Sequence, residues 1–178
     1  MLGRPGPVLS RSAQTGVRLL SQPGHQVMTV NGPAIQRVLF GCAGNTCRSV
    51  FAEYLARDCF KGAVVFESAG ISPQTAADAE NAIYTLKRNY NIDASNHVPR
   101  DVRSLNLAEY ELIIALEKRV AEQLVRELGA SANKVKVWKT SDPWGGDLAE
   151  YDACSLEIKK RVVQLRMSGE ARSFGSNE

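Results

Sequence analysis

The sequence lacks a C-x-x-C pair, a long apolar run and a basic stripe interleaved with aromatic residues. Its four cysteines stand at positions 42, 47, 59 and 154, and the only histidines are His25 and His97, so we expect no metal site. No segment approaches the roughly 20 apolar residues of a membrane-spanning helix, so we expect no membrane partner. A formal net charge of +3 without a basic stripe predicts no nucleic-acid partner. With no pairing pattern among the cysteines, we expect reduced thiols and a cytoplasmic location.

Acidic residues are missing from the first part of the chain, where no Asp or Glu precedes Glu53. Residues 1–35 contain arginines at positions 4, 11 and 18 and four prolines, which argue against a packed element and predict a flexible basic leader. An acid-free leader with arginine and serine also resembles an organellar transit peptide, which would change the predicted compartment. Met28 offers a third interpretation, as an alternative start shortly before Gln36. The sequence leaves these interpretations open.

The rest of the chain has the size and composition of one domain. With 178 residues and 44% hydrophobic content, the chain is long enough for one sizeable core and too short for a second full domain. We expect the domain at residues 36–168 and a frayed tail at residues 169–178.

Strands and helices are predicted in alternation. Apolar runs predict strands at residues 35–40, 63–66, 112–116 and 135–138. Helical spacing of apolar residues predicts helices at residues 49–60, 76–90, 117–128 and 148–167. With right-handed crossovers, this alternation predicts a doubly wound α/β domain: a four-stranded parallel sheet of flavodoxin-like order 2-1-3-4, flanked by helices.

The most informative segment is Cys42-Ala43-Gly44-Asn45-Thr46-Cys47-Arg48-Ser49, which lies between the first predicted strand and the first predicted helix. A glycine-bearing loop that opens into a helix turns backbone N–H groups toward one point, at the positive end of the helix dipole. That point suits a tetrahedral anion, and Arg48 adds a fork of donors that matches phosphate oxygens. The same field favours the thiolate form of a cysteine in the position of Cys42. The loop therefore predicts a phosphate site with a nucleophile inside it.

With Asp142-Pro143 near the end of the predicted domain, this loop resembles the low-molecular-weight protein tyrosine phosphatase family. The family signature C-x-G-N-x-C-R-S is matched at every fixed position. The resemblance implies that Cys42 attacks phosphorus to form a phosphocysteine, that Arg48 holds the phosphate oxygens, and that Asp142 is the general acid. It implies that no cofactor or metal is needed and that phosphorylated proteins are the substrates; we expect a monomer. The residues to which it assigns substrate binding are Ala43, Gly44, Asn45, Thr46, Cys47, Ser49 and Trp144.

Other residues near the loop have roles that the resemblance implies, some of them with plainer alternatives. Ser49 matches the hydroxyl that stabilises the thiolate. His97 matches a histidine in the hydrogen-bond network around Asn45, or is an ordinary surface-loop histidine. Cys47 matches a second loop cysteine that forms a reversible disulfide with Cys42, or packs as a small apolar residue. The other two cysteines lie in predicted helices, where we expect them in the core.

The chain departs from the common family pattern at Gly41, Val50 and Trp144. The first two replace an apolar β-branched residue and a proline, and affect loop stability. Trp144 followed by two glycines replaces paired tyrosines, which alters the wall of the pocket. Thr46 and the Asp-Pro-Trp-Gly-Gly motif resemble the protein arginine phosphatases of the family. This resemblance implies phosphoarginine as a substrate, and a hydroxyl suits a guanidinium, on which an aromatic ring can also stack. Neutral variation at Thr46 is the alternative, so phosphoarginine and phosphotyrosine both remain candidate substrates.

Two further functions share the loop. A thioredoxin-coupled arsenate reductase of the same fold would attack arsenate with the first cysteine, but it relays the disulfide to a cysteine pair after the acid motif, where this chain has only Cys154. A phosphoprotein-binding module would keep the anion cradle without chemistry, and the presence of Cys42, Arg48 and Asp142 argues against it. Arsenite formation would favour the first of these functions, and phosphate binding without turnover would favour the second.

Overall fold

The computed structural model describes residues 36–62 and 64–173, so the predicted basic leader and the last part of the predicted tail lie outside the described residues. The described chain contains an all-parallel four-stranded sheet with the order β2-β1-β3-β4. This confirms the doubly wound α/β fold and the order 2-1-3-4. The strands are β1 (Arg37–Cys42), β2 (Val65–Gly70), β3 (Leu112–Ala115) and β4 (Val135–Val137).

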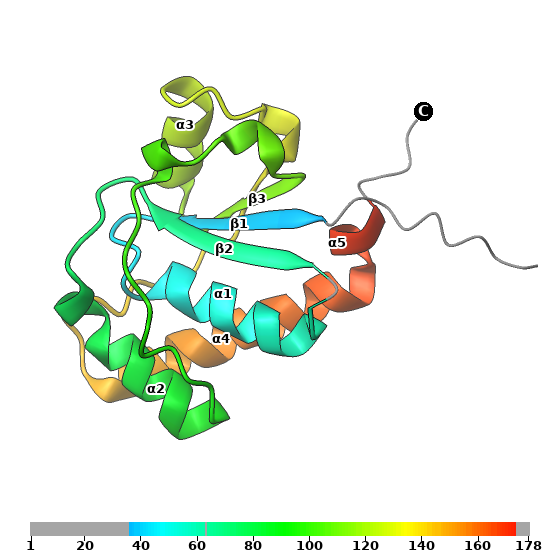
Figure 1. Cartoon of the computed structure of the whole chain (residues 1–178). Coiled ribbons are helices and arrows are strands. Elements are labelled where there is room, and N and C mark those ends of the chain that lie inside the picture. The colour runs from blue at the N-terminus through cyan, green and yellow to red at the C-terminus, as the bar shows by residue number, and fades with distance from the viewer. Residues whose placement is uncertain (1–35, 63, 174–178) are drawn as a thin grey trace, which may run out of the picture. The chain divides into compact units, whose positions relative to one another are not determined.

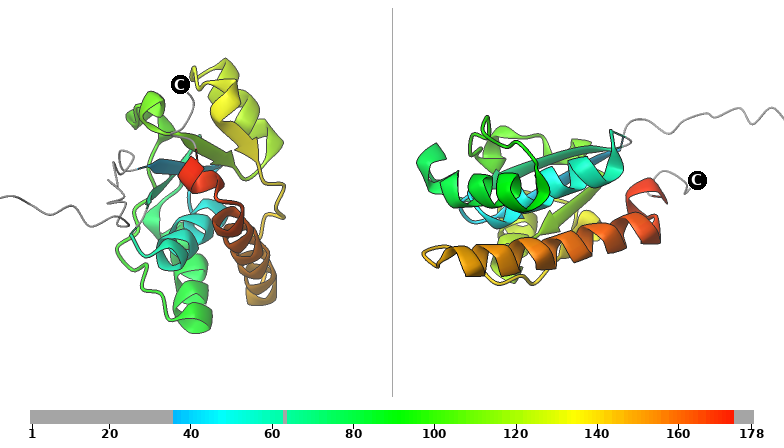
Figure 2. Two further views of the ribbon diagram at one scale, coloured as in Figure 1. Left: turned by 90° about the vertical axis from the view of Figure 1, so that its right-hand side faces the viewer. Right: turned by 90° about the horizontal axis from the view of Figure 1, so that it is seen from below.

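Helices cover both faces of the sheet (Figures 1 and 2). Helices α1, α2 and α4 pack against one another on one face, and α3 packs on the other face, against β3 and β4. The short helix α5 follows α4 directly. The helices are α1 (Arg48–Phe60), α2 (Glu80–Tyr90), α3 (Lys118–Arg126), α4 (Leu148–Ser168) and α5 (Glu170–Ser173).

The two interior strands are apolar because both of their faces are buried. Along β1, Val38 and Phe40 point into the cluster shared with α1 and α4, whereas Leu39 points into the cluster shared with α3. Along β3, Ile113 joins the α3 cluster, and Ile114 joins the cluster of the opposite face. This alternation follows from the two-residue period of a strand. The parallel pairing of β1 with β3 places their carboxyl ends side by side.

The predicted bounds of several elements were wrong. Strand β1 runs to Cys42 instead of ending at residue 40, and β2 runs from Val65 to Gly70 instead of covering residues 63–66. The reason is pairing: β1 and β2 stay in register from Arg37 with Val65 to Cys42 with Gly70, although Glu67 and Ser68 are polar. Residues 76–79 form a 3₁₀ turn before α2, and the packed chain extends past residue 168 because Ala171 of α5 is buried in the core.

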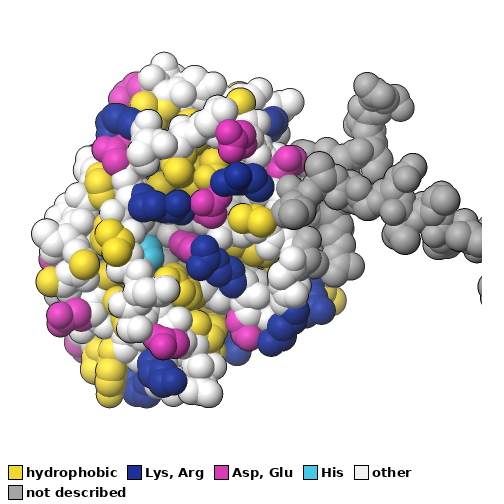
Figure 3. All heavy atoms as spheres, in the orientation of Figure 1, with side chains coloured by type: hydrophobic (Ala, Val, Ile, Leu, Met, Phe, Trp, Pro, Cys, Tyr) yellow, Lys and Arg dark blue, Asp and Glu magenta, His cyan; other side chains and the backbone are white. Residues whose placement is uncertain are grey.

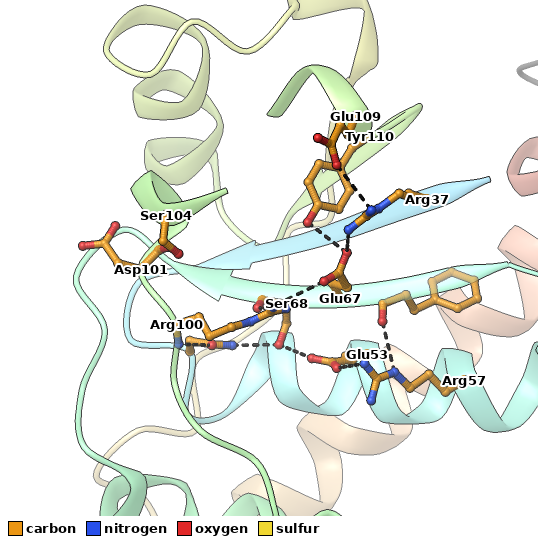
Figure 4. A network of polar contacts seen from close by, with 12 residues as sticks. Arg37, Glu53, Arg57, Glu67, Ser68, Arg100, Asp101, Ser104, Glu109 and Tyr110 are labelled. Atoms are coloured by element: carbon orange, nitrogen blue, oxygen red, sulfur yellow. Dashed lines mark hydrogen bonds and ion pairs between the residues drawn. The ribbon is translucent and has the colours of Figure 1, made fainter. Parts of the chain in front are cut away.

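Arginine side chains cover the open edge of β2. The outward carbonyl oxygen of Phe66 accepts a hydrogen bond from Arg57 Nε at 3.0 Å, and that of Ser68 accepts one from Arg100 Nη2 at 3.1 Å (Figure 4). On the face that carries β2 and α1, basic and acidic side chains alternate (Figure 3). The edge carbonyls are therefore satisfied by side chains of α1 and of the segment before β3.

Candidate active site

The loop between β1 and α1 wraps around the Cys42 sulfur. Cys42 is the last residue of β1, and Cys47 is the N-cap of α1. Asn45 takes a left-handed conformation with φ 55°, which asparagine tolerates better than most residues, and its backbone N–H donates to Cys42 Sγ at 3.2 Å. The turn at Asn45 thus points a main-chain amide at the sulfur from the positive end of α1.

The segment after β2 fixes the outer side of this loop. Backbone N–H groups of Ile71, Ser72 and Gln74 donate to the carbonyls of residues 42, 43 and 44, at 3.1, 3.0 and 2.9 Å. Gly70 lies so close that a Cβ atom placed on it would be 2.6 Å from the Ala43 carbonyl oxygen. The loop can therefore pack against the end of β2 only because residue 70 has no side chain.

A chain of buried polar groups leads away from the sulfur. Ser49 Oγ lies 2.9 Å from Cys42 Sγ, and Asn45 Nδ2 donates to both Ser49 Oγ at 2.9 Å and Ser68 Oγ at 2.8 Å. Ser68 in turn donates to Glu53, whose carboxylate pairs with Arg57 (Figure 4). These contacts hold Ser49 with its hydroxyl toward the sulfur.

His97 supports the same loop from behind. Its Nε2 donates to the Asn45 carbonyl oxygen at 2.9 Å, and the backbone N–H of Arg100 donates to Asn45 Oδ1 at 2.8 Å. The His97 side chain is buried and packs edge-on against the Tyr54 ring, with ring centroids 5.9 Å apart. The ordinary surface-loop interpretation of this histidine is therefore wrong.

Arg48 extends from the first turn of α1 to two carboxylates. Its guanidinium pairs with Asp142 and, through Nη1, with Glu117 Oε2 at 3.1 Å. Burial alone would lower the pKa of Arg48, but the negative charges of Asp142, Cys42 and Glu117 outweigh it and hold the pKa above its usual value. Arg48 therefore stays cationic, and its two partners fix the plane of the guanidinium.

One pocket, with a volume of about 120 Å³, brings most of the predicted site residues together. Trp144 is 52% exposed at its mouth, and its backbone N–H donates to Asp142 Oδ1 at 3.2 Å. Asn45, Ser49 and His97 lie behind the loop. The residues that line the pocket are Cys42, Ala43, Gly44, Thr46, Cys47, Arg48, Gln74, Asp142 and Trp144.

Sequence reasoning missed two residues of the site, Gln74 and Glu117. Gln74 belongs to the polar segment after β2, and Glu117 follows β3 at the carboxyl end of the sheet. The position of Glu117 offered a signal, because polar residues at the carboxyl ends of parallel strands face the binding crevice. No signal in the sequence pointed to Gln74. The predicted second strand ended at residue 66, so the segment after it was not expected to run beside the loop.

Two further thiols lie near the pocket in a reduced state. Burial raises the pKa of Cys47, whose sulfur lies 3.3 Å from the Tyr151 hydroxyl, and burial raises the pKa of Cys154 to about 12. Both thiols are therefore neutral at ordinary pH. Cys59, near the end of α1, was expected in the core. It is only partly buried and packs against the core from outside.

Within residues 36–62 and 64–173, no group of His, Cys, Asp and Glu side chains is arranged to hold a metal ion. Over the same residues, no helix has the length and apolarity to span a membrane.

Comparison with known proteins relates the chain to one family. Residues 37–172 match the family described as low molecular weight phosphotyrosine protein phosphatase. The low molecular weight protein-tyrosine-phosphatase Wzb of Salmonella typhi is 31% identical over 83 residues, which are 47% of this chain and 55% of that protein. The chain thus matches about half the length of this relative. The glutaredoxin arsenate reductase of Synechocystis sp. is 23% identical over 74% of this chain and 96% of its own length.

Solved structures share the fold. The low molecular weight protein tyrosine phosphatase of T. tengcongensis is 28% identical, with a TM-score of 0.69 over 75% of this chain and 99% of that one. The YwlE arginine phosphatase of Geobacillus stearothermophilus is 23% identical, with a TM-score of 0.70 over 80% of this chain and 98% of that one. At that identity, the second likeness speaks for the fold alone.

Proposed function

Since the chain belongs to the low molecular weight phosphotyrosine protein phosphatase family, we propose that it removes phosphate from proteins through a phosphocysteine. The observation that carries this proposal is the convergence of Cys42, Arg48 and Asp142 on one pocket at the carboxyl end of the sheet. The Asn45 amide and the Ser49 hydroxyl, at 3.2 and 2.9 Å from the sulfur, support a thiolate at Cys42.

In the first step, the phosphate group lies in the loop with its oxygens toward the main-chain amides and Arg48. The Cys42 thiolate attacks phosphorus in line with the leaving atom, an S–P bond forms, and the bond to the leaving oxygen or nitrogen breaks. The phosphate oxygens take the place of the Asp142 carboxylate on Arg48. Asp142, released from this ion pair and in its acid form, donates a proton to the leaving atom. Arg48 and the amides stabilise the charge on the equatorial oxygens.

In the second step, water attacks the phosphocysteine. The Asp142 carboxylate accepts a proton from the water as its oxygen bonds to phosphorus, and the S–P bond breaks. Inorganic phosphate leaves, the Cys42 thiolate returns, and Asp142 is again an acid. Thr46, on the pocket wall, offers a hydroxyl that can orient this water.

Two variants test the assignment. Cys42→Ser should abolish turnover of an aryl phosphate, and appreciable remaining activity in a folded variant would contradict the proposal. Asp142→Asn should slow substrates with poor leaving groups about 100-fold, within the usual range for general acids, and substrates with good leaving groups much less. Glu157→Gln on α4 is the matched control, since Glu157 pairs only with Arg161 within the described part of the chain.

For the finer question of substrate, we propose phosphoarginine ahead of phosphotyrosine. The support is the polar hydroxyl of Thr46 inside the pocket and the single exposed ring of Trp144 at its mouth. A guanidinium stacks on one aromatic face and tolerates a hydroxyl neighbour. Comparing kcat/KM on matched phosphoarginine and phosphotyrosine peptides decides between them. Thr46→Ile should move the ratio toward phosphotyrosine, and an unchanged ratio would remove Thr46 from the argument.

Arsenate reduction is the second candidate. It is favoured by two further thiols, Cys47 and Cys154, that bury their sulfurs close to the pocket. Against it, the high pKa of Cys154 makes this thiol a poor nucleophile at neutral pH. Arsenite formed from arsenate in the presence of thioredoxin, and lost in Cys154→Ser, would favour reduction over hydrolysis.

Phosphorylated proteins are the proposed partners, and a monomer is the proposed assembly, because the pocket is complete within one chain. Light scattering coupled to gel filtration measures the mass. The cytoplasm is the proposed compartment, and targeting through residues 1–35 is its alternative. Imaging fluorescent fusions that start at Met1 or at Met28 distinguishes the two.

A further inference from the structure

Besides the aromatic Trp144, the pocket is lined by a polar residue, Gln74, from the segment after β2. We propose that the Gln74 side-chain amide is a specificity-determining group, whose Oε1 accepts a hydrogen bond from the guanidinium of a phosphoarginine side chain. This inference rests on the proposed function and narrows its substrate class.

The backbone holds Gln74 in place beside the loop. Its N–H donates to the Gly44 carbonyl oxygen at 2.9 Å, the last of three such bonds between residues 71–74 and the loop. A Cβ atom on Gly44 would lie 2.9 Å from Gln74 Cγ, so the stem of Gln74 passes directly over the glycine. The absence of a side chain at position 44 therefore lets the Gln74 stem cross the loop, and Gln74 is one of the residues that line the pocket.

Within the described part of the chain, the Gln74 amide has no hydrogen-bond partner, and the residue is exposed. A free carbonyl oxygen at the pocket wall suits a ligand that brings N–H donors. Gln74 and Trp144 both line this pocket, so the group attached to a phosphoryl bound in the loop shares the pocket with both side chains.

The two candidate substrates differ at this point. The guanidinium of phosphoarginine keeps N–H donors in its plane after one nitrogen bonds to phosphorus, so it can stack on Trp144 and donate to Gln74 Oε1. The phenyl ring of phosphotyrosine has no donor and leaves the exposed amide to water. Phosphoarginine can therefore gain one neutral hydrogen bond at this wall that phosphotyrosine cannot make.

The experiment compares kcat/KM for phosphoarginine and phosphotyrosine peptides of matched sequence. Gln74→Leu keeps the stem and removes the amide; one neutral hydrogen bond predicts a three- to tenfold fall in the phosphoarginine to phosphotyrosine ratio. The fall should appear mainly in KM, because the contact exists in both the bound and the transition state. Gln74→Glu, a stronger acceptor, should raise the ratio. Gln164→Leu, the same change at an exposed position on α4, is the control.

If the wild-type enzyme prefers phosphoarginine and Gln74→Leu leaves the ratio of the two kcat/KM values unchanged, this inference alone is overturned. A fall of similar size in Gln164→Leu also overturns it, because the effect would not be local. A wild-type enzyme that turns over phosphotyrosine and not phosphoarginine overturns both this inference and the proposed substrate. Loss of all activity in Cys42→Ser distinguishes these cases from failure of the phosphatase assignment itself.

Discussion

Asn45 shapes the loop through its backbone conformation and also through its side chain. Its left-handed backbone turns the chain, its amide N–H donates to Cys42, and its Nδ2 group joins Ser49 to Ser68. Its own oxygens accept from His97 and from the Arg100 backbone. Backbone shape and side-chain bonding are therefore two separable contributions of one residue.

Replacing Asn45 by glycine and by alanine separates these contributions. Glycine keeps the left-handed turn and loses the side-chain bonds, whereas alanine loses both. We expect both variants to lose at least tenfold in kcat. We expect alanine to be less stable than glycine by about 1 kcal/mol in urea unfolding, the cost of a left-handed alanine. Equal stability of the two variants would contradict a role for the turn.

The Ser49 hydroxyl should control the reactivity of the sulfur. Ser49→Ala removes a hydrogen bond to the thiolate, worth about 1.5–3 kcal/mol for a charged acceptor. We expect iodoacetamide to alkylate Cys42 at least tenfold more slowly at pH 6. Ser104→Ala, on the surface, serves as the control. An unchanged alkylation rate would mean that the Ser49 hydroxyl orders the loop without acting on the sulfur.

At this scale, prediction from sequence depends on distance along the chain. Cys42 and Arg48 are close in sequence, so their local pattern predicts their common site. The role of Asp142 in the site was predicted only through the family resemblance. Glu117 contacts Arg48 across 69 positions, and no local pattern at either residue encodes that contact.

Among the elements, the end of β2 decides where the loop can lie. The Gly70 position is closed to any side chain by the Ala43 carbonyl oxygen at 2.6 Å. Gly41 is a matched contrast one strand away: a Cβ there would meet Val120 and Leu124 side chains at 3.4 and 3.5 Å, which is ordinary contact.

Gly70→Ala should therefore displace the loop, and Gly41→Ala should not. We expect Gly70→Ala to lose at least tenfold in kcat/KM and about 1–3 kcal/mol in the free energy of unfolding, the usual cost of overpacking. We expect Gly41→Ala to stay within about threefold and 1 kcal/mol of wild type. Steady-state kinetics and urea unfolding of both variants measure this, and similar losses in both would contradict the packing argument.

The elements were predictable where burial decides their sequence. The interior strand β3 is a continuous apolar run, and helices α2 and α3 bury residues at helical spacing on one face. The second half of β2 was not predictable, since Glu67 and Ser68 are polar for reasons that come from other elements. Glu67 bonds to Arg37 and Tyr110, and Ser68 serves the loop network.

For the whole molecule, Glu67 ties distant segments together (Figure 4). Burial would raise the pKa of this carboxyl, but hydrogen bonds from Arg37, Tyr110 and Arg100 outweigh burial and hold the pKa below its usual value. Burial, together with the hydrogen bond to Glu67, raises the pKa of Tyr110 to about 12. These bonds join β1, β2 and the segments that lead into β3.

A carboxyl whose pKa is lowered by folding stabilises the native state above its unfolded pKa, and this stability is lost as pH falls through the folded value. We therefore expect Glu67→Gln to be less stable than wild type at pH 7 by about 1.5–3 kcal/mol, the range for charged hydrogen bonds. The difference should shrink as the pH falls from 4.5, the ordinary glutamate pKa, through the lowered pKa of Glu67. Urea unfolding at pH 7, 4.5 and 3 measures it, and a constant difference would contradict the charge argument.

The two arginines that cover the edge of β2 also affect how copies of the protein behave toward one another. An open strand edge is a template for self-association, and here Arg57 and Arg100 occupy the carbonyls that an incoming strand would need. We expect Arg57→Ala combined with Arg100→Ala to aggregate in concentrated solution, seen as rising light scattering. Glu53→Gln, which loses the ion pair of Arg57 and leaves the edge covered, should stay dispersed. Resistance to aggregation in this protein would then depend on two guanidinium groups that take no part in its chemistry.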